Sequence, residues 1–198
     1  MLTVRACENP PAMEAQDKTD KTDSTQTQNP KSYPPAFERA VTRLLGDEGG
    51  YVDNPADPGG ETKFGITKRE YPDVDIAALT RAEAIAIYLR DWWQRYRYSE
   101  LPGPVAAKTF DLAVNIGPDH AVRCVQRALR ACGRRVTEDG AIGPATIVAA
   151  GAANQLALIA ALRAEAAGYY RALAALERGR RAGGDREFLT GWLNRAYE

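Results

Sequence analysis

The chain has 198 residues, enough for one domain with a real core or for a domain with a small appended lobe. Its 26 Lys and Arg residues balance its 26 Asp and Glu residues, so charge gives no reason to expect a nucleic-acid partner. The single His and the three cysteines, which form no C-x-x-C pair, argue against a zinc site and a disulfide framework.

The N-terminal residues 1–34 are rich in Thr, Asp, Lys, Gln, Asn and Pro and poor in apolar residues. Such a segment cannot bury enough surface to offset its ordering entropy, so we expect a disordered polar leader. It lacks the basic start and apolar stretch of a classical signal peptide, which predicts synthesis in the cytoplasm without one. Because the chain contains no run of 18 apolar residues, no membrane insertion is expected.

The first predicted helix begins near Pro35, because proline is favoured in the first turn. Apolar residues recur at helical spacing from Phe37 to Leu45 and give this helix one apolar face. We expect it to end within residues 46–50, where glycines gather. The following prolines and glycines predict an irregular or β-hairpin region at about 49–67.

Two more helices are predicted in the middle of the chain. Thr80 and Glu83 have the spacing of a capping box, which opens a helix that runs to Trp93. A second helix is expected from Pro104 to about Asn115. These elements complete a predicted N-terminal lobe that spans residues 35–118.

The remaining part, residues 119–198, is predicted to be a helical C-terminal lobe. Its helices are expected from Asp119 as a cap to Leu129, from Pro144, at 155–177, and after Asp185, where Trp192 should pack in the core. The whole chain is therefore expected to be mainly α.

Two carboxylates near the end of the first helix suggest acid–base chemistry. The negative end of the helix dipole and the neighbouring Asp47 should both raise the pKa of Glu48, as a general acid requires. Asp57 follows in a polar loop and should stay ionised. Two carboxyl groups in different environments are what glycosidic bond hydrolysis uses. Taken singly, Glu48 also fits a solvated surface residue and Asp57 a turn residue.

A twenty-residue run, EGGYVDNPADPGGETKFGIT at 48–67, closely resembles the signature of glycoside hydrolase family 108, the lysozyme-like N-acetylmuramidases. The resemblance continues through Tyr71-Pro72 and the stretch FDLAVNIG at 110–117, and it covers about residues 37–198. It implies a lysozyme-like α+β fold for the N-terminal lobe, with Glu48 as the catalytic acid. It also implies that no metal or organic cofactor is needed.

The spacing of Glu48, Asp57 and Thr62 is similar to that of phage-type lysozymes, in which an acid Glu is followed by an Asp and then a Thr. The interval from Glu48 to Asp57 is kept, whereas Thr62 comes one residue early. The resemblance implies that Asp57 acts as base or charge stabiliser and that Thr62 orients water. Asp53 and Glu61 are rival second carboxylates, and both inversion and retention remain open.

Several further residues are candidates for the walls of a glycan-binding cleft. Tyr51, Asp53 and Phe64 lie in or beside the acidic loop, and Trp93, Asp111 and Asn115 extend from helices. Each has a structural alternative, since an aromatic at helical spacing is more often a core residue.

The C-terminal lobe contains a V-Q-x-x-L pattern followed by D-G-x-x-G-P-x-T, which resembles peptidoglycan-binding helical modules. A plain turn at Asp139-Gly140 explains the glycines equally well. Arg123, Arg127 and Arg130 share one helical face, which either binds an anionic wall polymer or is simply solvated.

The sequence thus predicts a peptidoglycan hydrolase that cleaves the β-1,4 bond between N-acetylmuramic acid and N-acetylglucosamine. The alternative is a non-catalytic peptidoglycan-binding module that works through residues 119–198. We expect a monomer whose partner is bacterial peptidoglycan. Family members act as phage endolysins, secretion-associated muramidases or injected toxins, so we expect action on the wall, in the periplasm or outside, after release or non-classical export.

Overall fold

The computed structural model describes residues 33–46, 50–53, 60–178 and 186–197. Most of the predicted leader and the predicted cap Asp185 therefore lie outside the described residues. No helix in the described part has both the length and the apolar character that crossing a membrane requires.

Helix α1, Pro35–Leu45, begins and ends where the sequence predicts. Pro35 occupies the first turn, where its missing N–H leaves no helical bond unmade. Gly46 ends the helix with φ 46°, and its N–H donates to the carbonyls of Thr42 and Arg43. Glycine tolerates this positive φ because it has no Cβ.

The irregular region contains the predicted hairpin, formed by β1, Thr62–Lys63, and β2, Ile66–Thr67, which pair in antiparallel register. The turn between them is Phe64-Gly65, with φ of 55° and 75°. Positive φ at both turn residues is the mark of a type I′ turn, whose twist suits a two-residue hairpin. Val52 forms an isolated bridge with Thr62, so a third segment lies along β1.

Helix α2, Arg81–Ile87, opens with the predicted capping box, in which Thr80 and Glu83 bond reciprocally. The helix then continues as a π-helix, η1, Tyr88–Gln94, which the sequence did not predict. Its wider i→i+5 turn brings Tyr88 and Trp93, five residues apart, to the same buried side. A 3₁₀ turn, η2, Tyr98–Glu100, follows and was also not predicted.

Helices α3, Gly103–Ile116, and α4, Pro118–Ala131, meet at Gly117, whose φ is 86°. The prediction that Asp119 caps α4 is wrong, because Gly117 occupies the N-cap position and Pro118 the first turn. Asp119 instead accepts from the Arg123 guanidinium at 2.8 Å, one turn along the helix.

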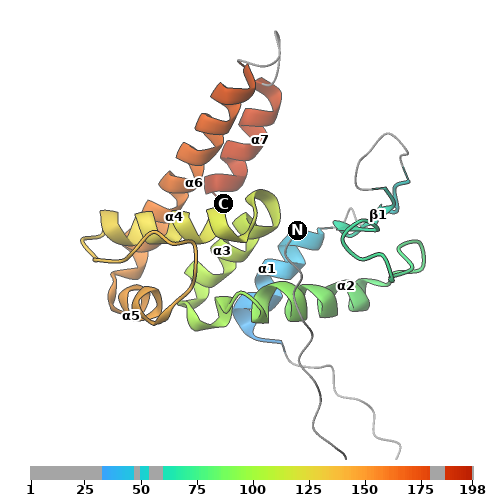
Figure 1. Cartoon of the computed structure of the whole chain (residues 1–198), viewed down its shortest axis with the longest axis horizontal. Helices are drawn as coiled ribbons and strands as arrows, with labels where there is room; N and C mark the ends of the chain where they lie inside the picture. The colour runs from blue at the N-terminus through green and yellow to red at the C-terminus, as the bar shows by residue number, and fades with distance from the viewer. Residues whose placement is uncertain (1–32, 47–49, 54–59, 179–185, 198) are drawn as a thin grey trace, which may run out of the picture. The chain divides into compact units, whose positions relative to one another are not determined.

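The C-terminal helices are α5, Pro144–Ala152, α6, Gln155–Arg178, and α7, Arg186–Tyr197. Helices α6 and α7 lie side by side (Figure 1). The Trp192 ring stacks on Tyr170 with ring centroids 5.7 Å apart, and it packs against the buried core as the sequence predicts.

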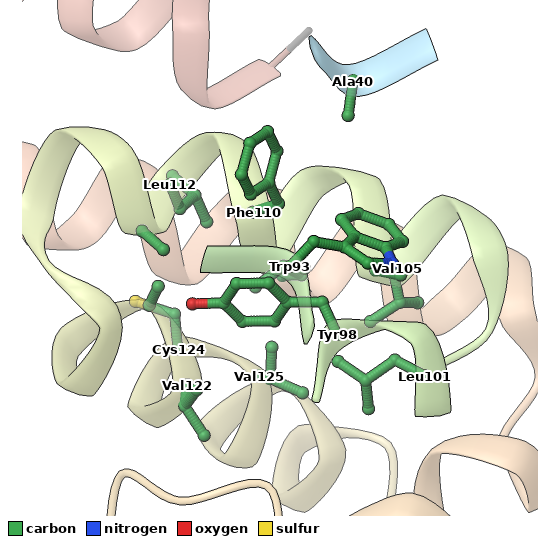
Figure 2. Close-up of a cluster of buried hydrophobic side chains, with 14 of the residues drawn as sticks. Ala40, Trp93, Tyr98, Leu101, Val105, Phe110, Leu112, Val122, Cys124 and Val125 are labelled. Atoms are coloured by element: carbon green, nitrogen blue, oxygen red, sulfur yellow. The ribbon is translucent and has the colours of Figure 1, made fainter. Parts of the chain in front are cut away.

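The core is built around aromatic rings that meet edge to face. Trp93 lies at the centre, with its ring centroid 5.4 Å from that of Phe37, 5.7 Å from that of Phe110 and 6.2 Å from that of Tyr98. Figure 2 shows Trp93, Tyr98 and Phe110 in one cluster with Val125 of α4. Hydrophobic burial is thus continuous from the hairpin into the C-terminal helices. The predicted mainly α fold with a small hairpin is confirmed.

Candidate functional site

The two carboxylates on which the predicted chemistry depends, Glu48 and Asp57, lie outside the described residues. The structure does describe the segments on either side of the acidic loop. These are the end of α1, residues 50–53 and the hairpin at 62–67. The candidate site is therefore built from these segments and from the face of α3 that carries Asp111.

The tip of the hairpin is fastened to the helical core by one hydroxyl. Tyr88 Oη donates a hydrogen bond of 3.0 Å to the Phe64 carbonyl. A Cβ on Gly65 would lie 2.8 Å from Tyr88 Oη, so only glycine fits beside the tyrosine hydroxyl. Burial raises the pKa of Tyr88 well above its usual range, which keeps the hydroxyl protonated as a donor. Sequence reasoning missed this role, because 24 residues separate the partners.

Thr62 is held in place by backbone bonds on β1. Its N–H donates to the Val52 carbonyl at 2.8 Å, and its own carbonyl accepts from the Val52 N–H at 2.9 Å. The Thr62 hydroxyl donates to the Gly60 carbonyl at 3.2 Å. A hydroxyl with its proton engaged still has lone pairs that accept a hydrogen bond, so Thr62 Oγ1 can receive one from a water.

Residues 50–53 present side chains to solvent. Tyr51 is 43% exposed and Val52 57% exposed, and Asp53 is exposed as well. Glu61 and Phe64, on or beside the hairpin, are half-buried. An exposed ring such as that of Tyr51 offers an apolar face with a polar tip, the combination that suits a sugar surface.

Trp93 lies in the core rather than on a cleft wall. Only 1% of its surface is exposed, and its ring packs among Phe37, Tyr98 and Phe110. This placement corrects the expectation that Trp93 binds substrate. The physical reason is the π-helical turn, which directs residue 93 inward together with Tyr88.

Asp111 and Asn115 lie one turn apart on α3 and are joined to each other and to the last helix. The Asn115 side-chain amide donates to the Asp111 backbone carbonyl at 2.6 Å, and its oxygen accepts from the Arg195 guanidinium. The buried Lys108 contacts the Asp111 carboxylate at 3.3 Å and donates to the Arg195 carbonyl. Sequence reasoning missed Lys108 and Arg195, since these contacts join residues 80 or more positions apart.

Asp111 also lines a pocket of about 200 Å³ formed by α1, α3 and α6. Its lining residues are Arg39, Ala40, Arg43, Pro104, Ala107, Lys108, Asp111, Ile159 and Arg163. Within the described ranges, no three His, Cys, Asp or Glu side chains come together as metal ligands would.

The two halves of the C-terminal sequence pattern meet at a buried side chain. The Gln126 amide nitrogen donates to Asp139 Oδ1 at 2.7 Å and to the Ala141 carbonyl at 3.0 Å. Its oxygen accepts from the Gly140 N–H at 3.0 Å. The glutamine of V-Q-x-x-L therefore fixes the D-G turn, which accounts for the spacing of the two motifs by folding alone.

The basic face of α4 is partly neutralised by its neighbours. Arg127 contacts the Glu138 carboxylate at 2.5 Å and Arg130 contacts it at 3.5 Å, while Arg123 pairs with Asp119. The guanidinium of Arg127 holds the pKa of Glu138 below its usual value of 4.5. The solvated-face interpretation fits these pairs, since surface ion pairs are common and individually weak.

Comparison with known proteins gives two family matches and one similar solved structure. A family model described as glycosyl hydrolase 108 matches residues 41–117, and one described as a predicted peptidoglycan domain matches residues 120–197. A solved structure of SagA from Brucella abortus is similar to this chain, with 29% identity and a TM-score of 0.60, over 81% of this chain and 92% of that chain. Among curated proteins, none matches.

Proposed function

Residues 41–117 make this chain a member of the glycosyl hydrolase 108 family, and on that premise we propose that it is an N-acetylmuramidase. The chain has a lysozyme-like fold and is a peptidoglycan hydrolase of the glycoside hydrolase class. The proposal specifies the bond, namely the β-1,4 link from N-acetylmuramic acid to N-acetylglucosamine.

The proposed chemistry assigns one role to each of three residues. Glu48 protonates the leaving glycosidic oxygen, Asp57 activates a water or stabilises the oxocarbenium-like transition state, and Thr62 orients that water. The observation that carries the proposal is the run at 48–67, which lies inside the family-matched segment. The held Thr62 hydroxyl and the fastened hairpin support it, because a catalytic loop needs rigid neighbours.

The test replaces the acid and keeps its shape. We expect Glu48→Gln to lower the rate of turbidity clearing of cell walls by about 10²–10⁴-fold, the usual contribution of a general acid. Glu38→Gln is the matched control, because Glu38 is an exposed glutamate in the first turn of α1. Wild-type clearing by Glu48→Gln would remove Glu48 from the mechanism.

The products identify the bond that is cleaved. Mass analysis of the digest should show muramic acid at the new reducing ends. Reducing N-acetylglucosamine ends would indicate a glucosaminidase, anhydro ends a transglycosylase, and free peptides an amidase.

The second carboxylate is tested separately. Asp57→Asn should lose activity, whereas Asp53→Asn and Glu61→Gln should retain most of it. The anomeric form of the first product, followed by NMR, distinguishes inversion from retention.

A second candidate function is wall binding without cleavage, favoured by the match of residues 120–197 to a predicted peptidoglycan domain. This candidate predicts that insoluble peptidoglycan retains the chain and releases no reducing sugar. Under our proposal, Glu48→Gln is retained by peptidoglycan without releasing reducing sugar, whereas the natural chain releases it.

We propose that the chain acts outside the cytoplasmic membrane, in the periplasm or beyond, because peptidoglycan lies there. Its role would be that of a phage endolysin or a secretion-associated muramidase. Fractionation of producing cells should find the active chain with the wall fraction. Activity confined to the cytoplasm of intact cells would contradict this placement.

A further inference from the structure

The pocket bounded by α1, α3 and α6 has a charge pattern that the proposed cleavage reaction does not use. Arg39 and Arg43 lie one turn apart on α1, so they face the same side. Lys108 enters from α3 and Arg163 from α6. Residues far apart in the chain therefore bring four cationic side chains around one opening.

Among the described residues that line the pocket, one carboxylate accompanies these four cations. It belongs to Asp111, which lies 3.3 Å from Lys108 Nζ. Burial is graded, because Lys108 is only 7% exposed whereas Arg39 and Arg43 are exposed and Arg163 is half-buried. Positive charge thus extends from the surface to the floor of the pocket, and a low-dielectric wall focuses its field on a bound anion.

The rest of the lining is apolar and the volume is small. Ala40, Pro104, Ala107 and Ile159 provide the apolar part. The volume of about 200 Å³ is below the roughly 300–1,000 Å³ of sites that enclose a whole small ligand. The pocket therefore fits one short group of a larger molecule, with an anionic end and a few carbon atoms.

We propose that this pocket binds a carboxylate of the stem peptide that peptidoglycan carries on its muramic acid residues. The guanidinium groups of Arg39, Arg43 and Arg163 have the planar donor geometry that suits a carboxylate. The apolar side chains of the lining contact the carbon atoms of the amino acid that bears this carboxylate. This inference rests on the proposed function, because the stem peptide belongs to the same polymer whose glycan strand is cleaved.

The position of the pocket supports a peptide carboxylate as the occupant. Arg43, Pro104 and Lys108 belong to the segment matched by the glycosyl hydrolase model, whereas Ile159 and Arg163 belong to the segment matched by the peptidoglycan domain model. The pocket thus joins the two regions at α3 and α6, where a polymer that both regions recognise would lie across them.

Binding of soluble wall fragments tests the proposal directly. The probes are the disaccharide N-acetylglucosaminyl-N-acetylmuramic acid with a tetrapeptide, the same disaccharide without peptide, and inorganic phosphate. Each is titrated into the full chain carrying Glu48→Gln, which prevents cleavage, and affinity is measured by calorimetry and NMR. We expect the tetrapeptide fragment to bind more tightly than the peptide-free fragment, and increasing salt to reduce the difference.

Arg39→Gln removes one exposed guanidinium and should weaken binding of the tetrapeptide fragment about 3–10-fold, while leaving binding of the peptide-free fragment unchanged. Arg171→Gln is the matched control, because Arg171 is exposed on α6 outside the pocket lining. Equal affinity for both fragments, or equal weakening by Arg39→Gln and Arg171→Gln, would overturn the proposal. Phosphate that displaces the peptide at comparable concentration would make the pocket a general anion site and would also overturn it.

Cleavage assays separate this proposal from the proposed function. On intact peptidoglycan, Arg39→Gln should raise KM and leave kcat near its normal value, whereas on glycan strands stripped of peptide it should change neither. A chain that cleaves no glycan at all refutes the muramidase proposal and leaves the binding measurements to decide on the pocket. A chain that cleaves normally and shows no preference for the tetrapeptide fragment refutes the pocket alone.

Discussion

Loss of one hydroxyl should loosen the hairpin without disturbing the core. Tyr88→Phe removes the donor that holds the Phe64 carbonyl at 3.0 Å and leaves the ring in place. That ring still packs edge to face on Phe110 with centroids 5.9 Å apart, so no cavity forms. The perturbation is therefore confined to the attachment of the hairpin tip.

The expected magnitude follows from the lost bond. An intramolecular hydrogen bond contributes a net of about 1 kcal/mol, and the partly buried Phe64 carbonyl is left unsatisfied. Phe64 also has φ 55°, a left-handed conformation that costs a non-glycine residue about 1–2 kcal/mol and must be held by its surroundings. We expect the free energy of unfolding to fall by about 1–2 kcal/mol, which lowers Tm by about 2–4 °C per kcal/mol in a chain of this size.

Two measurements check this prediction. Thermal unfolding gives the change in Tm, and hydrogen exchange of the Lys63 and Ile66 amides reports the local opening of the hairpin. Because burial keeps Tyr88 protonated, the difference between the natural chain and Tyr88→Phe should be constant from about pH 5 to pH 9. Turbidity clearing should fall as well, since Thr62 lies in the same hairpin.

Tyr96→Phe is the matched control. The Tyr96 ring packs on Trp92 and Tyr98, and among the described residues its hydroxyl meets no acceptor. This variant should leave Tm and hairpin exchange unchanged. If Tyr88→Phe also left both unchanged, the hydroxyl would not be what fastens the hairpin, and the account of the site's rigidity would be wrong.

Three further predictions concern stability. Gly140→Ala places a Cβ 2.1 Å from Asp119 Oδ1 at a φ of 78°, so urea denaturation should show a loss of about 1–3 kcal/mol. The contribution of Glu138, whose pKa is lowered by the Arg127 guanidinium, is complete above pH 4.5 and lost as pH falls through the lower folded-state pKa, so Glu138→Gln should reduce acid sensitivity in pH-dependent unfolding. Thr80→Ala removes the capping box and should lower the unfolding free energy by about 1 kcal/mol, with turbidity clearing unchanged when assayed well below Tm.

Local chemistry explains the parts of the fold that the sequence predicts well. Pro35 at a helix start, Gly46 at a helix end and the Thr80–Glu83 capping box each act within four residues, so their effect is visible in the sequence. The same holds for the hairpin turn region and for the apolar spacing of the long helices. The prediction of Asp119 as the cap was wrong because the helix begins two residues earlier, with Gly117 as the N-cap and Pro118 in the first turn.

The proposed catalytic residues also come from the sequence. Glu48, Asp57 and Thr62 stand out because a twenty-residue run keeps residue types in a fixed order, and the match of residues 41–117 supports that interpretation. The roles of Glu48 and Asp57 remain predictions for the Glu48→Gln and Asp57→Asn assays to decide.

Tertiary structure decided which side chains meet across the chain. The π-helical turn places Trp93 in the core, and Tyr88 forms a hydrogen bond with the Phe64 carbonyl. Packing also brings Lys108 and Asn115 to Arg195 in the last helix. It also gathered the cationic pocket from three helices. Periodicity and caps depend on neighbours within a few residues, whereas these contacts depend on how whole helices pack, and packing is set by burying all apolar faces at once.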